Sequence, residues 1–190
     1  MGRVSQAQAQ ENRKRVVEMA SHLFREQGTS VSVADLMKAA GLTHGGFYKQ
    51  FESKEALIDE AVSHAFGELA ERRATTLENS DGERSAAQRA MIDGYLSPRH
   101  RDSPATGCPA AGLATDMARD PGDRGAHRTY ADGVSDFADW LATDDPDRNR
   151  DGIVRLCTML GAVVLARATK DSPLSDEILE AARAALAPAP

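Results

Sequence analysis

Hydrophobic residues recur at intervals of three and four along most of the chain, the spacing that places them on one face of a helix. The pattern is clearest after Glu11, where these positions carry Val16, Val17, Ala20, Leu23 and Phe24. No segment of the sequence shows the sustained alternation of apolar and polar residues that is typical of a half-buried strand. The pattern therefore predicts an all-α fold.

Two glycines and a serine mark the ends of the first two predicted helices. Gly28 supplies the expected stop for the first helix, because glycine readily adopts the left-handed conformation found just past a helix C-terminus. Ser32 suits the N-cap of a second helix over residues 33 to 40, since its hydroxyl can accept a hydrogen bond from a free backbone N–H. We expect Gly41 to end this second helix as Gly28 ends the first.

A third and shorter helix is expected to begin at Thr43, a good N-cap residue. Phe47 and Phe51 lie four residues apart and therefore share one face of it. Gly45 and Gly46 fall inside the same helix, although each interior glycine costs about 1 kcal/mol relative to alanine. Stability alone does not explain this pair, which indicates that something else needs the space.

The remainder of the chain is predicted to form further helices. Ser53 is a suitable N-cap for a helix that runs to about Leu77. A loop is expected over residues 97 to 107, which are rich in proline and polar groups, and Pro109 then opens the next helix with Cys108 at or beside its cap. The other helices are predicted over residues 84–96, 109 to about 120, 125–142, 153–168 and 174–186.

The second and third predicted helices, joined by the turn at Gly41, have the layout of a helix-turn-helix, whose second helix enters the major groove of DNA. Charge supports this interpretation. The net charge is -6, yet residues 1–54 hold eight Lys/Arg and only five Asp/Glu, and a basic end allows an acidic protein to bind DNA locally. We expect an N-terminal three-helix domain over residues 1–54, followed by a larger helical domain over residues 55–190.

Three ordered motifs occur between Glu11 and Ala65. They are the Ala20-x-x-Leu23-Phe24-x-x-x-Gly28 run, the Val33-Ala34-x-x-Met37-x-x-Ala40-Gly41 helix and the Phe47-Tyr48-x-x-Phe51-x-Ser53-Lys54-Glu55-x-Leu57 signature. Together they resemble the DNA-binding domain of TetR/AcrR-family transcriptional regulators. From about Phe66 on, the resemblance is limited to helical organisation and a Gly-Cys-Pro segment. It implies a homodimer whose subunits each join an N-terminal DNA reader to a C-terminal ligand-binding and dimerisation domain.

The resemblance also implies which residues touch DNA. The start of the third helix would lie at the major groove, while Tyr48 and Lys54 would contact DNA phosphates. Gln50 stands where many relatives carry histidine, so no base contact is assigned to it. The expected DNA-binding residues are Ser32, Thr43, His44, Gly45, Gly46, Tyr48, Lys49 and Lys54.

Cys108 is a candidate sensor of electrophiles or oxidants, because a thiol at a helix N-terminus can react as the thiolate. The competing interpretation is a small apolar residue packed at the start of a helix. Cys157, inside the most apolar helix, is expected to serve packing only. A ligand pocket between the central helices is expected to be mostly apolar, and the alternative for the same residues is plain core. Its candidate residues are Tyr95, Met117, Tyr130, Phe137 and Trp140.

The last two predicted helices carry an apolar stripe too wide to be covered by one neighbouring helix. Two copies of this pair would form a four-helix dimer interface, and the alternative is a core within one chain. The expected interface residues are Ile153, Leu156, Leu160, Val163, Val164, Ile178, Leu179, Ala182 and Leu186.

These features favour a DNA-binding transcriptional regulator, most simply a repressor released from a palindromic operator by a small-molecule ligand. One alternative is a repressor that senses electrophiles through Cys108, and another is a helical interaction protein without DNA binding. A hydrolase is disfavoured, because the sequence has no Gly-x-Ser-x-Gly elbow and no paired acid and base. The histidines and cysteines do not cluster at metal-ligand spacing, so we expect neither a metal nor a cofactor.

We expect the protein to stay in the cytoplasm. No apolar stretch approaches the ~20 residues that cross a bilayer. The first ten residues also lack the apolar core of a secretory signal.

Overall fold

A computed structural model describes residues 6–119, 125–143 and 150–187, and these residues form helices, turns and loops without a strand. The all-α prediction is therefore confirmed for the described part of the chain. The N-terminal elements are α1 (Gln6–Gln27), α2 (Val33–Ala39), the 3-10 helix η1 (His44–Lys49) and α3 (Lys54–Glu78). The elements that follow are α4 (Arg84–Tyr95), α5 (Pro98–Arg101), the 3-10 helix η2 (Pro104–Thr106), α6 (Pro109–Gly112), α7 (Ala114–Arg119), α8 (Gly125–Leu141), α9 (Asp151–Ala168) and α10 (Leu174–Leu186).

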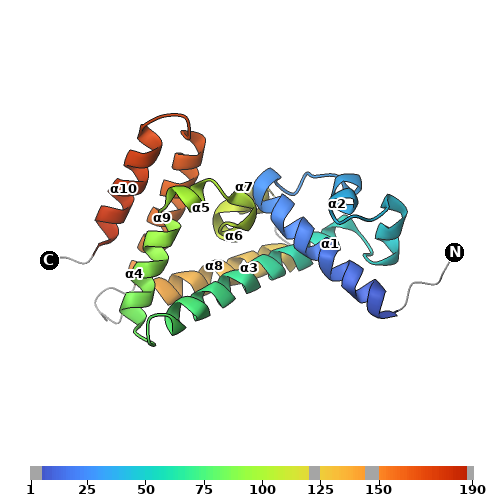
Figure 1. Cartoon of the computed structure of the whole chain (residues 1–190), viewed down its shortest axis with the longest axis horizontal. Coiled ribbons are helices and arrows are strands. Elements are labelled where there is room, and N and C mark those ends of the chain that lie inside the picture. The colour runs from blue at the N-terminus through green and yellow to red at the C-terminus, as the bar shows by residue number, and fades with distance from the viewer. Residues whose placement is uncertain (1–5, 120–124, 144–149, 188–190) are drawn as a thin grey trace.

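The long helix α3 joins two ends of an elongated molecule (Figure 1). At one end α1, α2 and η1 gather around its first turns. Along the rest of its length α3 packs against α8 and α4, and α8 in turn packs against α9. The helices α9 and α10 lie together at the end of the molecule opposite the N-terminus (Figure 1).

The predicted helix ends are confirmed at four positions. The Ser32 hydroxyl accepts a hydrogen bond from the N–H of Asp35 at 3.1 Å, and that of Ser53 accepts one from Ala56 at 3.1 Å. Gly28 and Gly41 adopt φ values of +83° and +71°, the left-handed conformation that lets the chain leave a helix.

Thr43 does not cap the third helix as predicted. It occupies the N-cap position with extended backbone, but its side chain makes no capping hydrogen bond. The element that follows is a short 3-10 helix, held by bonds such as that from the Gly46 N–H to the Thr43 carbonyl at 2.9 Å. A six-residue segment with two glycines has little intrinsic α-helix propensity, which favours this tighter form.

Three other boundaries differ from those predicted. The first helix begins at Gln6 instead of Glu11. The predicted loop at residues 97–107 contains two short helices, α5 and η2. The single helix predicted after Pro109 is divided at Leu113 into α6 and α7. The predicted turns near residues 120–123 and 144–149 lie outside the described residues.

The core of the N-terminal end is built around the two phenylalanines of the third motif. Phe47 and Phe51 stack with their ring centroids 5.4 Å apart, and both are buried together with Phe24 and Leu36. Leu23 is only half-buried. This small core holds η1 against α1 and α2.

Arg13 of α1 contacts the residues that directly follow η1. Its guanidinium lies 4.6 Å from the centre of the Phe51 ring and donates from Nε to the Gln50 carbonyl at 3.3 Å. It also forms a two-pronged ion pair with Glu60 of α3. One side chain of α1 therefore fixes η1 relative to α3.

The helices α8 and α9 approach each other most closely at Gly152. A Cβ atom at this position would lie 2.1 Å from the Ala138 carbonyl oxygen and 2.9 Å from the Ala142 nitrogen. Both are backbone atoms and cannot rotate away. The absence of a side chain at residue 152 therefore sets the distance between the two helices.

The substitution Gly152→Ala should destabilise the fold by about 1–3 kcal/mol, the usual cost of overpacking a core. The control is Gly67→Ala in α3, where a Cβ would have no neighbour within 4 Å and alanine should be neutral or stabilising by up to about 1 kcal/mol. Urea unfolding followed by circular dichroism measures both. Equal stability of Gly152→Ala and the wild type would contradict the close approach of α8 and α9.

Candidate nucleic-acid interface and ligand cavity

The 3-10 helix η1 has one buried face and one open face. Phe47 is fully buried, whereas Tyr48 exposes 69% of its surface and His44 and Lys49 are also exposed. The open face of η1 thus presents polar and basic side chains beside Tyr48.

The two glycines of η1 are not required by the fold. Neither has a positive φ angle. A Cβ at Gly45 would meet nothing within 4 Å, and one at Gly46 would make an ordinary contact of 3.5 Å with the Met37 methyl group. The protein itself leaves room for a side chain at both positions, so the fold does not account for the glycine pair.

The other expected DNA-binding residues lie around this face. Thr43 precedes η1 and is exposed, and Lys54 is the half-buried first residue of α3. Within the described part of the chain, neither Lys49 nor Lys54 forms an ion pair, so both charges are available. Ser32 is already engaged, because its hydroxyl donates to the Asp35 carboxylate at 2.6 Å while capping α2.

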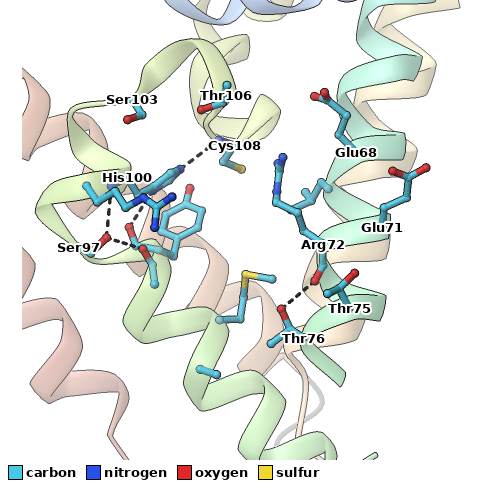
Figure 2. A pocket seen from close by; sticks show the side chains of 16 residues that line it. Glu68, Glu71, Arg72, Thr75, Thr76, Ser97, His100, Ser103, Thr106 and Cys108 are labelled. Carbon is cyan, nitrogen blue, oxygen red and sulfur yellow. Dashed lines mark hydrogen bonds between the residues drawn. The ribbon is translucent and has the colours of Figure 1, made fainter. Parts of the chain in front are cut away.

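A separate cavity of about 790 Å³ lies between α3 and α4 and is bounded by the segment from α5 to the start of α6 (Figure 2). Its wall combines apolar residues with hydroxyl groups, two carboxylates and two guanidinium groups. The lining residues are Glu68, Leu69, Glu71, Arg72, Thr75, Thr76, Ala90, Met91, Gly94, Tyr95, Ser97, Arg99, His100, Ser103, Thr106 and Cys108.

Two of the predicted ligand or sensor residues, Tyr95 and Cys108, line this cavity, and the others do not. Met117 and Phe137 are buried in the core. The Tyr130 hydroxyl donates to the Ala110 carbonyl at 2.6 Å, which commits its polar end to α6. The other candidates, Met117, Tyr130, Phe137 and Trp140, do not line this cavity. Their role in ligand binding stays a prediction.

Trp140 is half-buried and packs beside Phe137 with the ring centroids 6.5 Å apart. Its backbone carbonyl accepts a hydrogen bond from the Gln88 side chain at 2.8 Å. Trp140 therefore helps to join α8 to α4.

His100 is held neutral in the cavity wall. Its Nδ1 lies 2.8 Å from the Tyr95 carbonyl oxygen and its Nε2 lies 3.2 Å from the Cys108 N–H. The first contact requires a proton on Nδ1, and the second requires none on Nε2. Burial lowers the pKa of His100 to about 4, assisted by the nearby positive charges of Arg167 and Arg72 and opposed by the bond to Tyr95.

The two cysteines differ in exposure. Cys108 is buried at the N-cap of the four-residue helix α6. The adjacent His100 cannot remove its proton, since Nε2 already accepts the Cys108 N–H. The expectation that Cys157 only packs inside the chain is wrong, because Cys157 is exposed. It lies on the face of α9 that points away from the rest of the protein.

A buried arginine links the cavity to the N-terminal end, and the sequence interpretation missed it. The Arg25 side chain is fully buried and donates to the Glu68 carboxylate at 2.7 Å and to the Gly107 carbonyl at 3.1 Å. Burial lowers its pKa, and the charge of Glu68 opposes that shift. The only sequence signal was an arginine beside Phe24, where an apolar residue would continue the buried face of α1.

The expected dimer residues divide into two groups. Leu156, Val163 and Leu179 are buried among α8, α9 and α10 of one chain, so assigning them to an intersubunit surface was wrong. Leu160, Ile178, Ala182 and Leu186 are half-buried against the same core. Ile153 and Val164 are exposed by 55% and 47%.

Further apolar side chains extend this exposed surface of α9 and α10. Val154 and Leu165 of α9 and Leu174 at the start of α10 are each about half exposed or more, at 61%, 56% and 47%. Ile153, Val154, Val164, Leu165 and Leu174 form what we term the apolar face. It lies at the end of the molecule farthest from the N-terminus (Figure 1).

Within residues 6–119, 125–143 and 150–187, no group of three or more His, Cys, Asp or Glu side chains could hold a metal ion. Among the same residues, no helix combines the length and apolar character needed to cross a membrane.

Comparisons with known proteins converge on one group. Residues 16–61 match the family model described as "Bacterial regulatory proteins, tetR family". The transcriptional regulator AcrR of Shigella flexneri is 39% identical over 61 residues, and the transcriptional repressor DhaR of Mycobacterium sp. (strain GP1) is 38% identical over 69 residues. These matches cover 32% and 36% of this chain, but only 28% and 35% of the two relatives.

The solved structures extend the similarity to the whole chain. The crystal structure of a TetR transcriptional regulator from Chloroflexus aurantiacus J-10-fl superposes with a TM-score of 0.76 and 27% identity. The superposition covers 95% of this chain and 94% of that protein. Sequence similarity is thus concentrated in the N-terminal third, while the fold is shared along the full length.

His100 should remain neutral, with its proton on Nδ1, until the pH falls to about 4. Because its pKa is about 6.5 in the unfolded chain, the unfolded state binds more protons between these two values. Stability should therefore be complete above pH 6.5 and should fall by up to about 3 kcal/mol as the pH drops to 4. Long-range ¹H–¹⁵N NMR of the ring measures both the tautomer and the pKa.

The variant His100→Asn should lack this part of the pH dependence in urea unfolding, whatever its stability at neutral pH. Titration of the folded His100 ring near pH 6.5 would show that burial does not hold it neutral.

Proposed function

Because residues 16–61 match the tetR family model and the fold matches a TetR transcriptional regulator over 95% of the chain, we propose that the protein belongs to this family. We propose further that it binds double-stranded DNA through η1 and represses transcription until a small molecule releases it. The observation that carries the proposal is the open face of η1. There Gly45 leaves space that the fold does not use, next to the exposed Tyr48 and Lys49. These are the features of a surface that approaches a partner closely.

In this proposal the open face of η1 enters the major groove. Backbone at Gly45 and Gly46 would approach the bases, and His44 and Lys49 would supply donors to base edges or phosphates. Tyr48 and Lys54 would contact phosphates, as would the free backbone N–H groups at the start of α3. Arg13 supports this arrangement from behind by holding η1 against α3.

A homodimer would give the two readers a fixed separation. Two η1 elements about 34–36 Å apart would meet successive major grooves on one side of the duplex and read a palindromic operator. The apolar face of α9 and α10 is the surface we assign to a second copy, because exposed apolar side chains of this number on one helix pair gain free energy from being covered.

The cavity between α3 and α4 is the proposed ligand site. Its volume of about 790 Å³ lies within the range of pockets that hold small molecules. Arg25 connects its wall at Gly107 and Glu68 directly to α1. A ligand that moved this wall would therefore change the position of the DNA reader, and a coupling of about 1–3 kcal/mol is usual for such effects.

A second form of release follows from the presence of the Cys108 thiol in the cavity wall. An electrophile that entered the cavity could modify this sulfur covalently. Release would then require the thiol and would persist after the electrophile was removed. The burial of Cys108 and the neutral, fully bonded His100 make this route the second choice.

The variant Gly45→Leu should keep the fold and weaken operator binding by about tenfold or more, since the new side chain would occupy the space reserved for DNA. The control is Gly67→Leu, which places the same side chain at another exposed helical position without a neighbour within 4 Å. Gel-shift titrations on the DNA that flanks the gene measure affinity, and circular dichroism checks the fold. Normal binding by Gly45→Leu would refute the close approach of these glycines.

Salt dependence in the same assay tests the phosphate contacts. Lys54→Ala should weaken binding to all sequences alike and reduce the salt slope by about 1. A wild-type protein that produced no specific, salt-sensitive shift would favour the alternative of a helical interaction protein without DNA binding.

The double variant Ile153→Glu, Val164→Glu should convert the dimer to a monomer, because burying the new carboxylates in an apolar interface is costly. The control is Ala131→Glu on the exposed side of α8. Sedimentation velocity measures the mass of each protein in solution, and circular dichroism shows whether the monomer is folded. A dimer that survived the double substitution would have to use another surface.

A further inference from the structure

The cavity between α3 and α4 contains a buried hydrogen-bond donor without an oxygen or nitrogen acceptor among the described residues. Tyr95 is only 4% exposed, and its hydroxyl makes no hydrogen bond of good geometry in this part of the chain. Burial raises the pKa of Tyr95 well above its usual value, and the Cys108 thiol beside the hydroxyl adds to the shift through its charge and a hydrogen-bond contact. The phenol therefore keeps its proton and remains able to donate. A buried donor of this kind is normally satisfied, so its position indicates a group that arrives from outside.

Arg72 places a positive charge at the same cavity. Its guanidinium forms no ion pair with any residue in the described ranges, and Figure 2 shows it reaching from α3 toward Cys108. Its charge lowers the pKa of both Arg25 and His100, as expected of a cation that faces them. Arg99 lines the cavity as well and is likewise without an ion-pair partner in the described part of the protein.

The two carboxylates of the wall do not cancel this charge. Glu68 is committed to the buried Arg25, with 2.7 Å between Nη2 and Oε2. Glu71 lies on α3 with its carboxylate directed away from Cys108 (Figure 2). His100 adds no charge, because it is neutral. The inner side of the cavity therefore carries the charge of Arg72, which is unpaired among the described residues, and the serine and threonine hydroxyls of the wall can donate as well as accept hydrogen bonds.

Apolar side chains complete the wall beside these donors. Leu69 of α3 and Met91 of α4 line the cavity, together with the small residues Ala90 and Gly94. Gly94 has no neighbour within 4 Å of its Cβ position, so this part of the wall is open. One side of the cavity thus carries positive charge and hydrogen-bond donors, and the neighbouring side is apolar.

We propose that the ligand of this cavity is a small organic acid, whose carboxylate binds Arg72 and the Tyr95 hydroxyl while its apolar body lies against Leu69 and Met91. The effect of this ligand on DNA binding rests on the proposed function, whereas the binding of the acid to the cavity does not. A carboxylate can form an ion pair with the guanidinium and accept a hydrogen bond from the phenol. A neutral amide cannot form the ion pair, and a protonated amine would be repelled by the guanidinium.

Calorimetric titration of the full-length protein without DNA tests the ligand class. The probes are 2-naphthoate, 4-phenylbutanoate and decanoate, each paired with its primary amide, and 2-naphthylmethylamine serves as the cation. At least one carboxylate should bind about tenfold or more tightly than its amide, since hydrogen bonds to a charged group are the stronger ones. The amine should not bind measurably.

Variants then locate the site. Arg72→Gln should weaken carboxylate binding by about tenfold, while Arg128→Gln removes the same charge at an exposed position of α8 and should have no effect. Tyr95→Phe should weaken binding of the carboxylate and should change binding of the amide by no more than a small factor. Its thermal stability should not fall, because the hydroxyl makes no bond that the fold needs.

Three outcomes would overturn the organic-acid site. They are amides that bind as tightly as their acids, a preference for the amine, or carboxylate binding that Arg72→Gln leaves unchanged. Failure of all three carboxylates to bind would overturn it equally. If the acids bind as expected but do not release DNA in the gel-shift assay, the site stands and the proposed ligand-controlled repression fails.

Discussion

The buried guanidinium of Arg25 is the interaction on which the arrangement of the two ends depends. A charge taken out of water must be matched by an opposite charge and by hydrogen bonds, or it destabilises the fold by several kcal/mol. Here the match comes from Ser21 within α1, Glu68 of α3 and the Gly107 carbonyl. These partners can serve one guanidinium only if α1, α3 and the cavity wall keep a fixed relation. Arg25 therefore fixes the position of α1 relative to the cavity wall.

Local chemistry explains which parts of the fold could be predicted from the sequence. Ser32 and Ser53 cap helices because a hydroxyl needs only the three residues that follow it. Gly28 and Gly41 end helices because their φ angles are set within a single turn. The phenylalanine pair of η1 reached the core for the same reason, since spacing alone decides which face the two rings share. Thr43 failed as a cap because the element after it became a 3-10 helix.

The cavity and the apolar face could not be predicted in the same way, because they depend on how helices distant in sequence pack together. Tyr95 and Tyr130 look alike as aromatic residues in amphipathic helices. Only the position of α6 commits the Tyr130 hydroxyl to Ala110 and leaves that of Tyr95 free. On α9 the apolar residues run around most of the helix. Which of them are covered, such as Leu156, and which remain exposed, such as Ile153, is decided by α8 and α10.

The unoccupied space above Gly45 takes no part in the packing that stabilises η1. The side chains that hold η1 in place, Phe47 and Phe51, point inward, and no protein atom lies within 4 Å of the Cβ position at residue 45. Substitutions at this position can alter the surface offered to a partner without repacking the core. If η1 contacts DNA as proposed, a change of target sequence at this position need not cost the protein its fold.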